Sequence, residues 1–405
     1  MIFKMALRNI LRQKRRSFLT ALGMIFGMVI MSFSISLVDG TYGTIIETFT
    51  KGQSGFLQIH AGDYLNNPSL YKNIKYPQKV TKVLDREQNI IGYTPRVYAA
   101  GLAFFKNKST GISLQGIDPE REKLVTGLNL KWSNNVNFKD SEERAVIVSS
   151  RLAGFFNLVA GDALVIISQG ADGSIANDKY RVKGFFDAKK NGLNSQLIYI
   201  PLNTMQEFLS LGDRVHEYAI LTKDILQSRK DSIRLAQKLP ASLNLAVAPW
   251  QVVLKDFYQA MEADKQGNRI TLGILIFMVA LGILNTVLMS VMERTREFGV
   301  LKAIGTRPQT IFKLILLENS LLACFSLFIG MSISIALVYY FSVHEIKLRE
   351  AFNYGGLEFT GMRGILSYKV ILVPAAVVYF SSLLVSLWPA FRAALIEPIK
   401  AMNDY

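Results

Sequence analysis

Four long runs of the chain contain no aspartate, glutamate, lysine or arginine, and no other feature limits the possible folds as much. A helix needs about 20 apolar residues to cross a bilayer. Hydrophobic residues make up 50% of the sequence, and the mean hydropathy is positive at +0.25. We therefore predict a membrane protein with four transmembrane helices. They cover residues 17–38, 270–292, 319–343 and 370–391.

The first run could instead be the core of a signal peptide, because basic residues precede it. It is longer than a usual signal core, and no small-x-small cleavage pattern closes it. We therefore predict an anchor that stays in the protein.

Basic residues at the N-terminus predict the orientation. Residues 1–16 carry six lysines and arginines and no acid, which is typical of the cytoplasmic side of a membrane. Phe3, Leu7, Ile10 and Leu11 fall on one helical face of this segment, so we predict a cytoplasmic amphipathic helix at the interface. With four spans, residues 293–318 and the tail 392–405 are also expected inside.

The same topology places residues 39–269 and the loop 344–369 outside the cytoplasm. Residues 39–269 are long enough for a folded domain, and helical spacing at both ends predicts stalk helices that continue the first two spans. The single cysteine, Cys324, lies in the third run, so the outer domain has no disulfide of its own. Its basic residues are dispersed, which makes nucleic acid an unsuitable partner.

Short alternating or β-branched runs dominate the outer domain. Asp172-Gly173 predicts a hairpin turn between two of them, and helices are expected at about 78–88, 149–158, 202–211 and 224–238. The runs fall into groups before and after about residue 125, which suggests two lobes. The predicted fold class is therefore a four-helix membrane protein with a large α+β extracytoplasmic domain between its first and second helices.

Motifs for catalysis or energy supply are not found in the sequence. It has no GxxxxGK[ST] phosphate loop, no HExxH and no Cys/His cluster. The three histidines are far apart, which favours structural roles, and the spans lack the ionisable residues of an ion-coupled carrier. Any transport would therefore draw its energy from another protein.

The bridge at 293–318 has a regular pattern of its own. Phe298, Val300, Leu301 and Ile304 form an apolar stripe beside charged residues, and Gly305 is a typical helix stop. Pro308, within a Thr-x-x-Gln capping pattern, predicts the start of the next helix. The pattern fits both a rigid lever and a helix that only anchors the spans at the interface. In the first span, Gly23 and Gly27 form a GxxxG pattern that would allow close helix packing.

Several segments resemble FtsX-like permeases, the membrane subunits of ABC transporters that include lipoprotein-releasing and macrolide-exporter types. ERTREFGVLKAIGTRPQTI resembles their cytoplasmic segment, and LRNILRQKRRSFLTALG their N-terminal start. GISLQGIDPEREKL and ERAVIVSSRLAGFFNLVAGDALVI are similar to the outer domain of the lipoprotein-releasing permeases. The closing WPAFRAALIEPIKAM matches the family's C-terminal signature at Pro389, Ala390, Arg392, Ala393, Pro398 and Ala401.

The resemblance implies a subunit without catalytic residues, cofactor or metal of its own. A separate cytoplasmic ABC ATPase dimer would bind ATP and dock on the bridge, and the stalks would transmit its motion to the outer domain. The absence of a phosphate loop from the sequence agrees with this. Exporters with a fused ATPase differ, because they carry that loop in the same chain. The coupling residues would be Glu293, Arg294, Arg296, Glu297, Gly299, Val300, Leu301, Lys302, Ile304 and Gly305.

The same resemblance implies a bacterial inner membrane protein that pairs with a second permease, either an identical copy or a sibling. It would extract lipoproteins and pass them to a periplasmic carrier, for which the 168–180 hairpin is a candidate hook. Two alternatives stay open: a tripartite efflux permease for drugs or peptides, and a regulator of a periplasmic enzyme that transports nothing.

Overall fold

The computed structural model describes residues 2–12, 14–127, 138, 144–188, 194–354 and 357–397. The chain forms two compact units. One comprises Met1–Thr44, Met261–Glu350 and Thr360–Tyr405, and the other Ile45–Ala260 and Ala351–Phe359.

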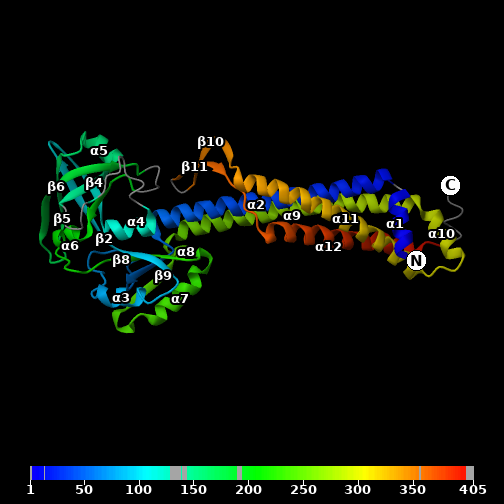
Figure 1. The fold of residues 1–405 in the computed structure, drawn as a ribbon, viewed down its shortest axis with the longest axis horizontal. Helices are drawn as coiled ribbons and strands as arrows, with labels where there is room; N and C mark the ends of the chain where they lie inside the picture. The colour runs from blue at the N-terminus through cyan, green and yellow to red at the C-terminus, as the bar shows by residue number, and fades with distance from the viewer. Residues whose placement is uncertain are drawn as a thin grey trace. The chain divides into compact units, whose positions relative to one another are not determined.

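The first unit is built from helices that run side by side (Figure 1). Four are long and apolar enough to cross a membrane, and each contains one of the predicted runs, which confirms four candidate spans. The helices are α1 (Ile2–Arg12), α2 (Lys14–Phe49), α9 (Lys255–Glu293), α10 (Thr295–Ala303), α11 (Pro308–Val343) and α12 (Tyr368–Leu395).

The bundle has a buried interior and an apolar exterior. Met24, Met28 and Ile315 belong to one buried cluster, whereas Phe277 and Phe328 are 62% and 72% exposed. Large exposed apolar side chains all around a bundle are expected where lipid, and not water, surrounds it.

The first two candidate spans are parts of longer helices, as predicted. α2 runs on to Phe49, and α9 already begins at Lys255. The Tyr42 hydroxyl donates a hydrogen bond to Asp264, and the Lys265 ammonium lies 5.4 Å from the centre of the Tyr42 ring.

The second unit is an α+β domain. Its strands are β1 (Leu57–Ala61), β2 (Ile90–Phe105), β3 (Lys108–Ile117), β4 (Ala145–Ser149), β5 (Ala163–Gln169), β6 (Ile175–Phe186), β7 (Leu197–Pro201), β8 (Glu217–Thr222) and β9 (Leu245–Pro249). Its helices are α3 (Pro77–Leu84), α4 (Pro119–Thr126), α5 (Ser150–Phe156), α6 (Leu202–Phe208), α7 (Ser228–Lys238) and α8 (Trp250–Val253). A separate two-stranded sheet of β10 (Ile346–Tyr354) and β11 (Leu357–Met362) occupies part of the predicted loop 344–369.

The strands pair into one sheet in the order β3-β7-β4-β6-β5-β2-β8-β1-β9, and β2 also pairs with β3. That additional pairing closes β3, β7, β4, β6, β5 and β2 into a ring, while β8, β1 and β9 extend from the first half of β2. The predicted division at about residue 125 is wrong, because strands from both sides of that position pair within the ring.

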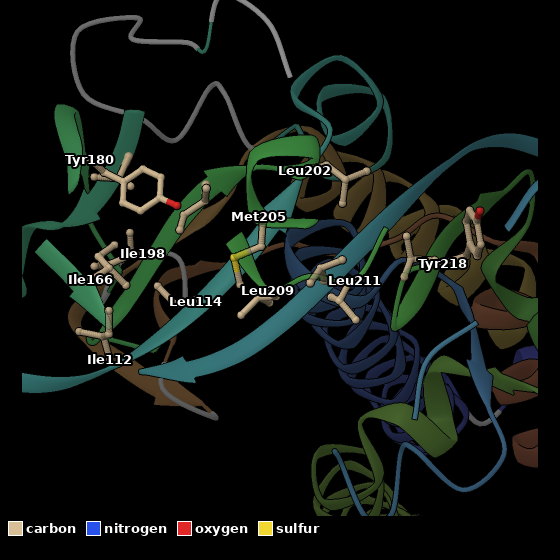
Figure 2. Packing of buried hydrophobic residues seen from close by; sticks show 14 of the residues in the cluster. Ile112, Leu114, Ile166, Tyr180, Ile198, Leu202, Met205, Leu209, Leu211 and Tyr218 are labelled. Atoms are coloured by element: carbon tan, nitrogen blue, oxygen red, sulfur yellow. The ribbon is translucent and has the colours of Figure 1, made fainter. Parts of the chain in front are cut away.

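Alternate residues of the ring strands share one core. Ile112 and Leu114 of β3 pack in the same cluster as Ile166, Tyr180 and Ile198, as a period of two requires (Figure 2). Helix α6 adds Leu202 and Met205 to this core (Figure 2). A Cβ at Gly116 would lie 2.7 Å from the Cβ of Met205, so a glycine lets α6 approach β3 closely.

The predicted turn at Asp172-Gly173 is confirmed. β5 and β6 pair antiparallel up to Gln169 and Ile175. The amide of Gly170 donates to the Ser174 carbonyl over 2.9 Å, and Gly173 has a φ of +87°. Glycine adopts this left-handed backbone without strain.

A buried ionic cluster joins β2, α4 and β8. The Arg96 guanidinium contacts Glu122 with Nε at 3.2 Å and Glu217 with Nη1 at 3.0 Å. The three side chains are at most 5% exposed. Burial opposes the charge of Arg96, but Glu122, Tyr98 and Glu217 hold its pKa well above its usual value.

Two histidines lie beside this cluster, and both stack on the Tyr64 ring. The centroids of His60 and His216 lie 5.3 and 5.4 Å from that of Tyr64. Nδ1 of His216 accepts the Tyr98 N–H over 3.0 Å, and Nε2 faces the Leu70 carbonyl at 3.0 Å. This arrangement fits a neutral ring that donates from Nε2, and burial lowers the pKa of both histidines. Both side chains are buried and pack on Tyr64.

The domain is therefore expected to lose stability in mild acid. An unfolded histidine takes up a proton near pH 6.5, whereas the buried rings resist protonation, so the free energy of unfolding falls as the pH drops below about 6.5. Thermal unfolding between pH 8 and pH 5, compared with His216→Gln, checks this. The variant should show a weaker pH dependence, and equal slopes would contradict the role of His216.

Candidate functional site

The bridge folds as a short helix between two corners. α9 ends at Glu293, α10 covers Thr295–Ala303, and α11 begins at Pro308. Gly305, with a φ of +94°, donates its amide to the Lys302 carbonyl, and Thr306 donates to the carbonyl of Leu301. This pair of bonds is a Schellman motif, so the predicted helix stop at Gly305 is confirmed.

The predicted capping box before α11 is wrong. Pro308 occupies the first turn as expected, but Arg307 and not Thr306 is the N-cap, and no side-chain cap bond forms among the described residues. The amide of Thr306 donates its hydrogen bond within the Schellman motif at the end of α10. Helix α11 therefore begins one residue later than the capping pattern indicated.

The inner side of α10 is held by a buried aromatic ring and an ion pair. Phe298 is 1% exposed and belongs to the core of the bundle. Nη1 of Arg294 lies 3.2 and 3.0 Å from the two carboxylate oxygens of Glu318, and its Nε donates to Glu297 over 3.0 Å. Burial opposes the charge of Arg294, but Glu318 and Glu297 raise its pKa, so the Arg294 guanidinium stays protonated.

Lys302 connects α10 to the end of α12. Its Nζ donates to the carbonyl of Ala394 over 3.0 Å and to that of Ile396 over 2.7 Å. Carbonyls at a helix C-terminus lack partners within the helix, and a cation is favourable there. The short helix is therefore bound to both of its neighbours in the sequence and also to α12.

The outer side of α10 exposes apolar side chains. Val300 and Ile304 are 45% and 74% exposed, and Met292 at the end of α9 is 71% exposed. The prediction of a single apolar stripe is wrong, because Phe298 is buried whereas Val300 is exposed. At 100° per residue, Phe298 and Val300 point in nearly opposite directions.

The ten predicted coupling residues thus divide between two sides. Arg294 and Gly299 are buried, and Leu301 and Lys302 are half-buried. The others are exposed: Glu293, Arg296, Glu297, Val300, Ile304 and Gly305.

Four polar residues contact this region although the sequence analysis did not connect them with it. Glu318 receives Arg294 and also the amide of Asn9. Arg12 lies 3.6 Å from Glu297, and Arg16 lies 3.1 Å from Glu293. The position of Glu318 was a usable signal, because an isolated acid at the start of a long apolar run costs free energy unless a cation accompanies it.

The two glycines of the GxxxG pattern have different surroundings. A Cβ at Gly27 would lie 2.6 Å from a methyl group of Val279 in α9, whereas one at Gly23 would meet no described heavy atom within 4 Å. A packing role for the pair stays a prediction. In the C-terminal signature, Pro389, Ala390 and Ala393 are buried in α12, Arg392 is exposed, and Pro398 and Ala401 lie outside the described residues.

The bridge combines a packed side with an exposed side. It presents an apolar face on a short helix whose opposite side is fixed by packing, ion pairs and a lysine cap. A solvent-exposed apolar face of this kind suits recognition of another surface.

Two curated relatives show how much of this chain resembles known proteins. It is 23% identical over 420 residues to "Macrolide export ATP-binding/permease protein MacB" of Mannheimia succiniciproducens, covering 99% of this chain and 60% of the relative. The protein of that name from Aggregatibacter actinomycetemcomitans is 27% identical over 343 residues, covering 79% and 50%. The chain thus spans about half to three fifths of the length of these relatives.

Among solved structures, the periplasmic region of MacB from Actinobacillus actinomycetemcomitans matches with a TM-score of 0.38 at 14% identity. It covers 49% of this chain and 91% of that one. The extracellular domain of the transporter YknZ from Gram-positive bacteria matches with a TM-score of 0.34 at 17% identity, covering 47% and 98%.

Two family models together account for most of the sequence. The MacB-like periplasmic core domain matches residues 17–235, more than half of the chain. The FtsX-like permease C-terminal model matches residues 269–398, which include α10 and its exposed face. The chain therefore belongs to the FtsX-like permease family and carries a MacB-like periplasmic core domain.

Proposed function

We propose that this permease is the membrane subunit of an ABC transporter and that a separate cytoplasmic ATPase dimer docks on the outer side of α10. One observation carries the proposal: Val300 and Ile304 are exposed on a helix whose opposite side is buried. Apolar side chains exposed together mark interaction surfaces. The competing interpretation is that this face enters the membrane interface and only anchors the spans.

The anchoring of α10 supports a role in transmitting motion. A partner that displaces α10 would move α9 directly, because only Arg294 separates the two helices. It would also move α12 through Lys302. We propose an inner-membrane topology in which both termini and α10 lie in the cytoplasm, on the strength of the basic N-terminus.

For the substrate, we propose lipoproteins that are extracted from the inner membrane and handed to a periplasmic carrier, with a second permease, identical or sibling, completing the complex. The similarity of the segments around β3, α4, β4, α5 and β5 to lipoprotein-releasing permeases supports this choice. Export of macrolide-like drugs is the second candidate, since the relatives above are named macrolide exporters.

Charge placed on the exposed face of α10 is expected to abolish ATPase docking. Val300→Asp combined with Ile304→Asp should lower co-purification of the ATPase by about 30-fold or more, because a lost hot spot costs about 2 kcal/mol. Leu226→Asp, at a position 87% exposed in the periplasmic domain, is the control and should have no effect. Retained docking in the double variant would favour the anchor.

Two further variants test the shape of α10. Gly299→Pro should break the helix, and Glu297→Lys should reverse the charge beside Arg294. Both should uncouple the ATPase while leaving insertion into the membrane intact. If co-purification and ATPase activity survive both changes, α10 is not the coupling element.

The substrate is tested by purifying the permease with its ATPase and identifying what accompanies it. An acylated polypeptide or a periplasmic carrier would support lipoprotein release. Binding of a macrolide, with an adaptor in place of a carrier, would support the second candidate.

A further inference from the structure

Helix α1 has an apolar face that the described part of the chain leaves exposed. Ala6 is fully buried against the bundle, whereas Phe3, Leu7 and Leu11 are 55%, 46% and 61% exposed. These three residues are four apart and form one row along the helix. An exposed row of this size on an amphipathic helix needs an occupant.

A basic row runs directly beside the apolar one. Lys4, Arg8 and Arg12 follow the apolar residues by one position each and are exposed. The segment up to residue 16 contains no acid. An occupant that combines an apolar interior with negative charge at its surface fits both rows.

The position of α1 in the chain identifies that occupant as lipid. α2 begins at Lys14, two residues after α1 ends, and is apolar enough to cross a membrane. Phe18 and Leu19 in its first turns are 64% and 66% exposed. If α2 crosses the membrane, the apolar row of α1 lies close in sequence to the end of that span, where a lipid leaflet would be present.

Two bases of this region also contact α10 or the end of α9. Arg12 lies 3.6 Å from Glu297 of α10, and Arg16 lies 3.1 Å from Glu293. The side chains of Arg12 and Glu297 are 77% and 48% exposed, so this pair is weak and open to a competing anion.

We propose that α1 is a binding surface for anionic phospholipid, and that a lipid phosphate competes with Glu297 for Arg12. The composition of the adjacent leaflet would thereby change the contacts of α10. This proposal goes beyond ATPase docking and does not depend on it, because the lipid and Glu297 meet at Arg12 whether or not an ATPase is bound.

Lipid contact is measured on the full chain in nanodiscs, with and without phosphatidylglycerol. Cys324→Ser removes the only cysteine, and Leu7→Cys then carries a single nitrobenzoxadiazole label. Quenching by spin-labelled phosphatidylglycerol is compared with quenching by spin-labelled phosphatidylcholine. We expect the anionic lipid to be preferred by about fivefold or more, since each base near the surface contributes about 1 kcal/mol.

Two matched double variants show which basic residues cause the preference for phosphatidylglycerol. Arg8→Gln with Arg12→Gln should abolish it, whereas Arg307→Gln with Lys313→Gln, which removes the same charge near the start of α11, should leave it within about twofold. Equal quenching by the two lipids in the parent protein would overturn the proposal. An equal loss of the preference for phosphatidylglycerol in both double variants would also overturn it. A label that neither lipid quenches would overturn it as well, because protein would then cover α1.

Competition for Arg12 has a separate test. Glu297→Gln removes the internal partner of Arg12 and should raise the preference for phosphatidylglycerol. An unchanged or lower preference would overturn the competition. Since no ATPase is present, a failure here is distinguishable from a failure of the docking assignment.

Discussion

Replacing Arg96 by methionine is expected to lower the free energy of unfolding of the periplasmic domain by about 3–5 kcal/mol. The change leaves Glu122 and Glu217 buried without their cation, and two carboxylates at 2% and 5% exposure cannot recover the lost interaction from water. Hydrogen–deuterium exchange of the β2 and β8 amides in the full chain measures the loss, because both strands carry residues of the cluster.

Arg144 provides the matched control. It also contacts two carboxylates, Asp178 at 3.2 Å and Glu207 at 3.3 Å, but it is 59% exposed. Arg144→Met should therefore cost less than about 1 kcal/mol. Changing Glu122 and Glu217 to leucine together with Arg96→Met should recover much of the loss. Similar effects of Arg96→Met and Arg144→Met would show that burial of the cluster is not what matters.

Gly40→Ala is expected to destabilise the membrane bundle by about 1–3 kcal/mol. A Cβ at this position of α2 would lie 2.1 Å from the carbonyl oxygen of Arg363, a backbone atom that cannot turn aside. The resulting separation would also break the hydrogen bonds that Ser36 exchanges with the backbone of Ile365. Thermal unfolding of the purified chain in detergent measures the effect.

Gly43→Ala is the control for this prediction. It lies on the same helix, but a Cβ there would meet no described heavy atom within 4 Å. The better helix propensity of alanine should make this variant neutral or more stable, by up to about 1 kcal/mol. A loss of stability at Gly43 equal to that at Gly40 would contradict the steric account.

Features that depend on local composition could be predicted from the sequence. The candidate spans follow from the absence of charge over more than 20 residues, since few folds other than a membrane bundle accept such runs. The hairpin at Asp172-Gly173 and the helix end at Gly305 follow from the left-handed backbone that glycine allows. These signals need no knowledge of distant residues.

Features that depend on distant partners could not be predicted. The 16 residues of β2 pair with β3, β5 and β8, and nothing within the strand indicates where one partner gives way to the next. Phe298 and Val300 are both apolar, and only the position of the bundle decides which of them is buried. The partners of Lys302 lie more than 90 residues away, at the end of α12.

Lys302 connects α10 to the end of α12, in addition to the backbone connection between α10 and α9. If an ATPase docks on α10 as proposed, a force on α10 would reach α9 along the backbone and α12 through the Lys302 ammonium. Lys302→Met would remove the connection to α12 and leave the connection to α9 intact, so the transmitted response should be weaker but not absent. One mechanical input would in this way be shared between two helices that lie far apart in the chain.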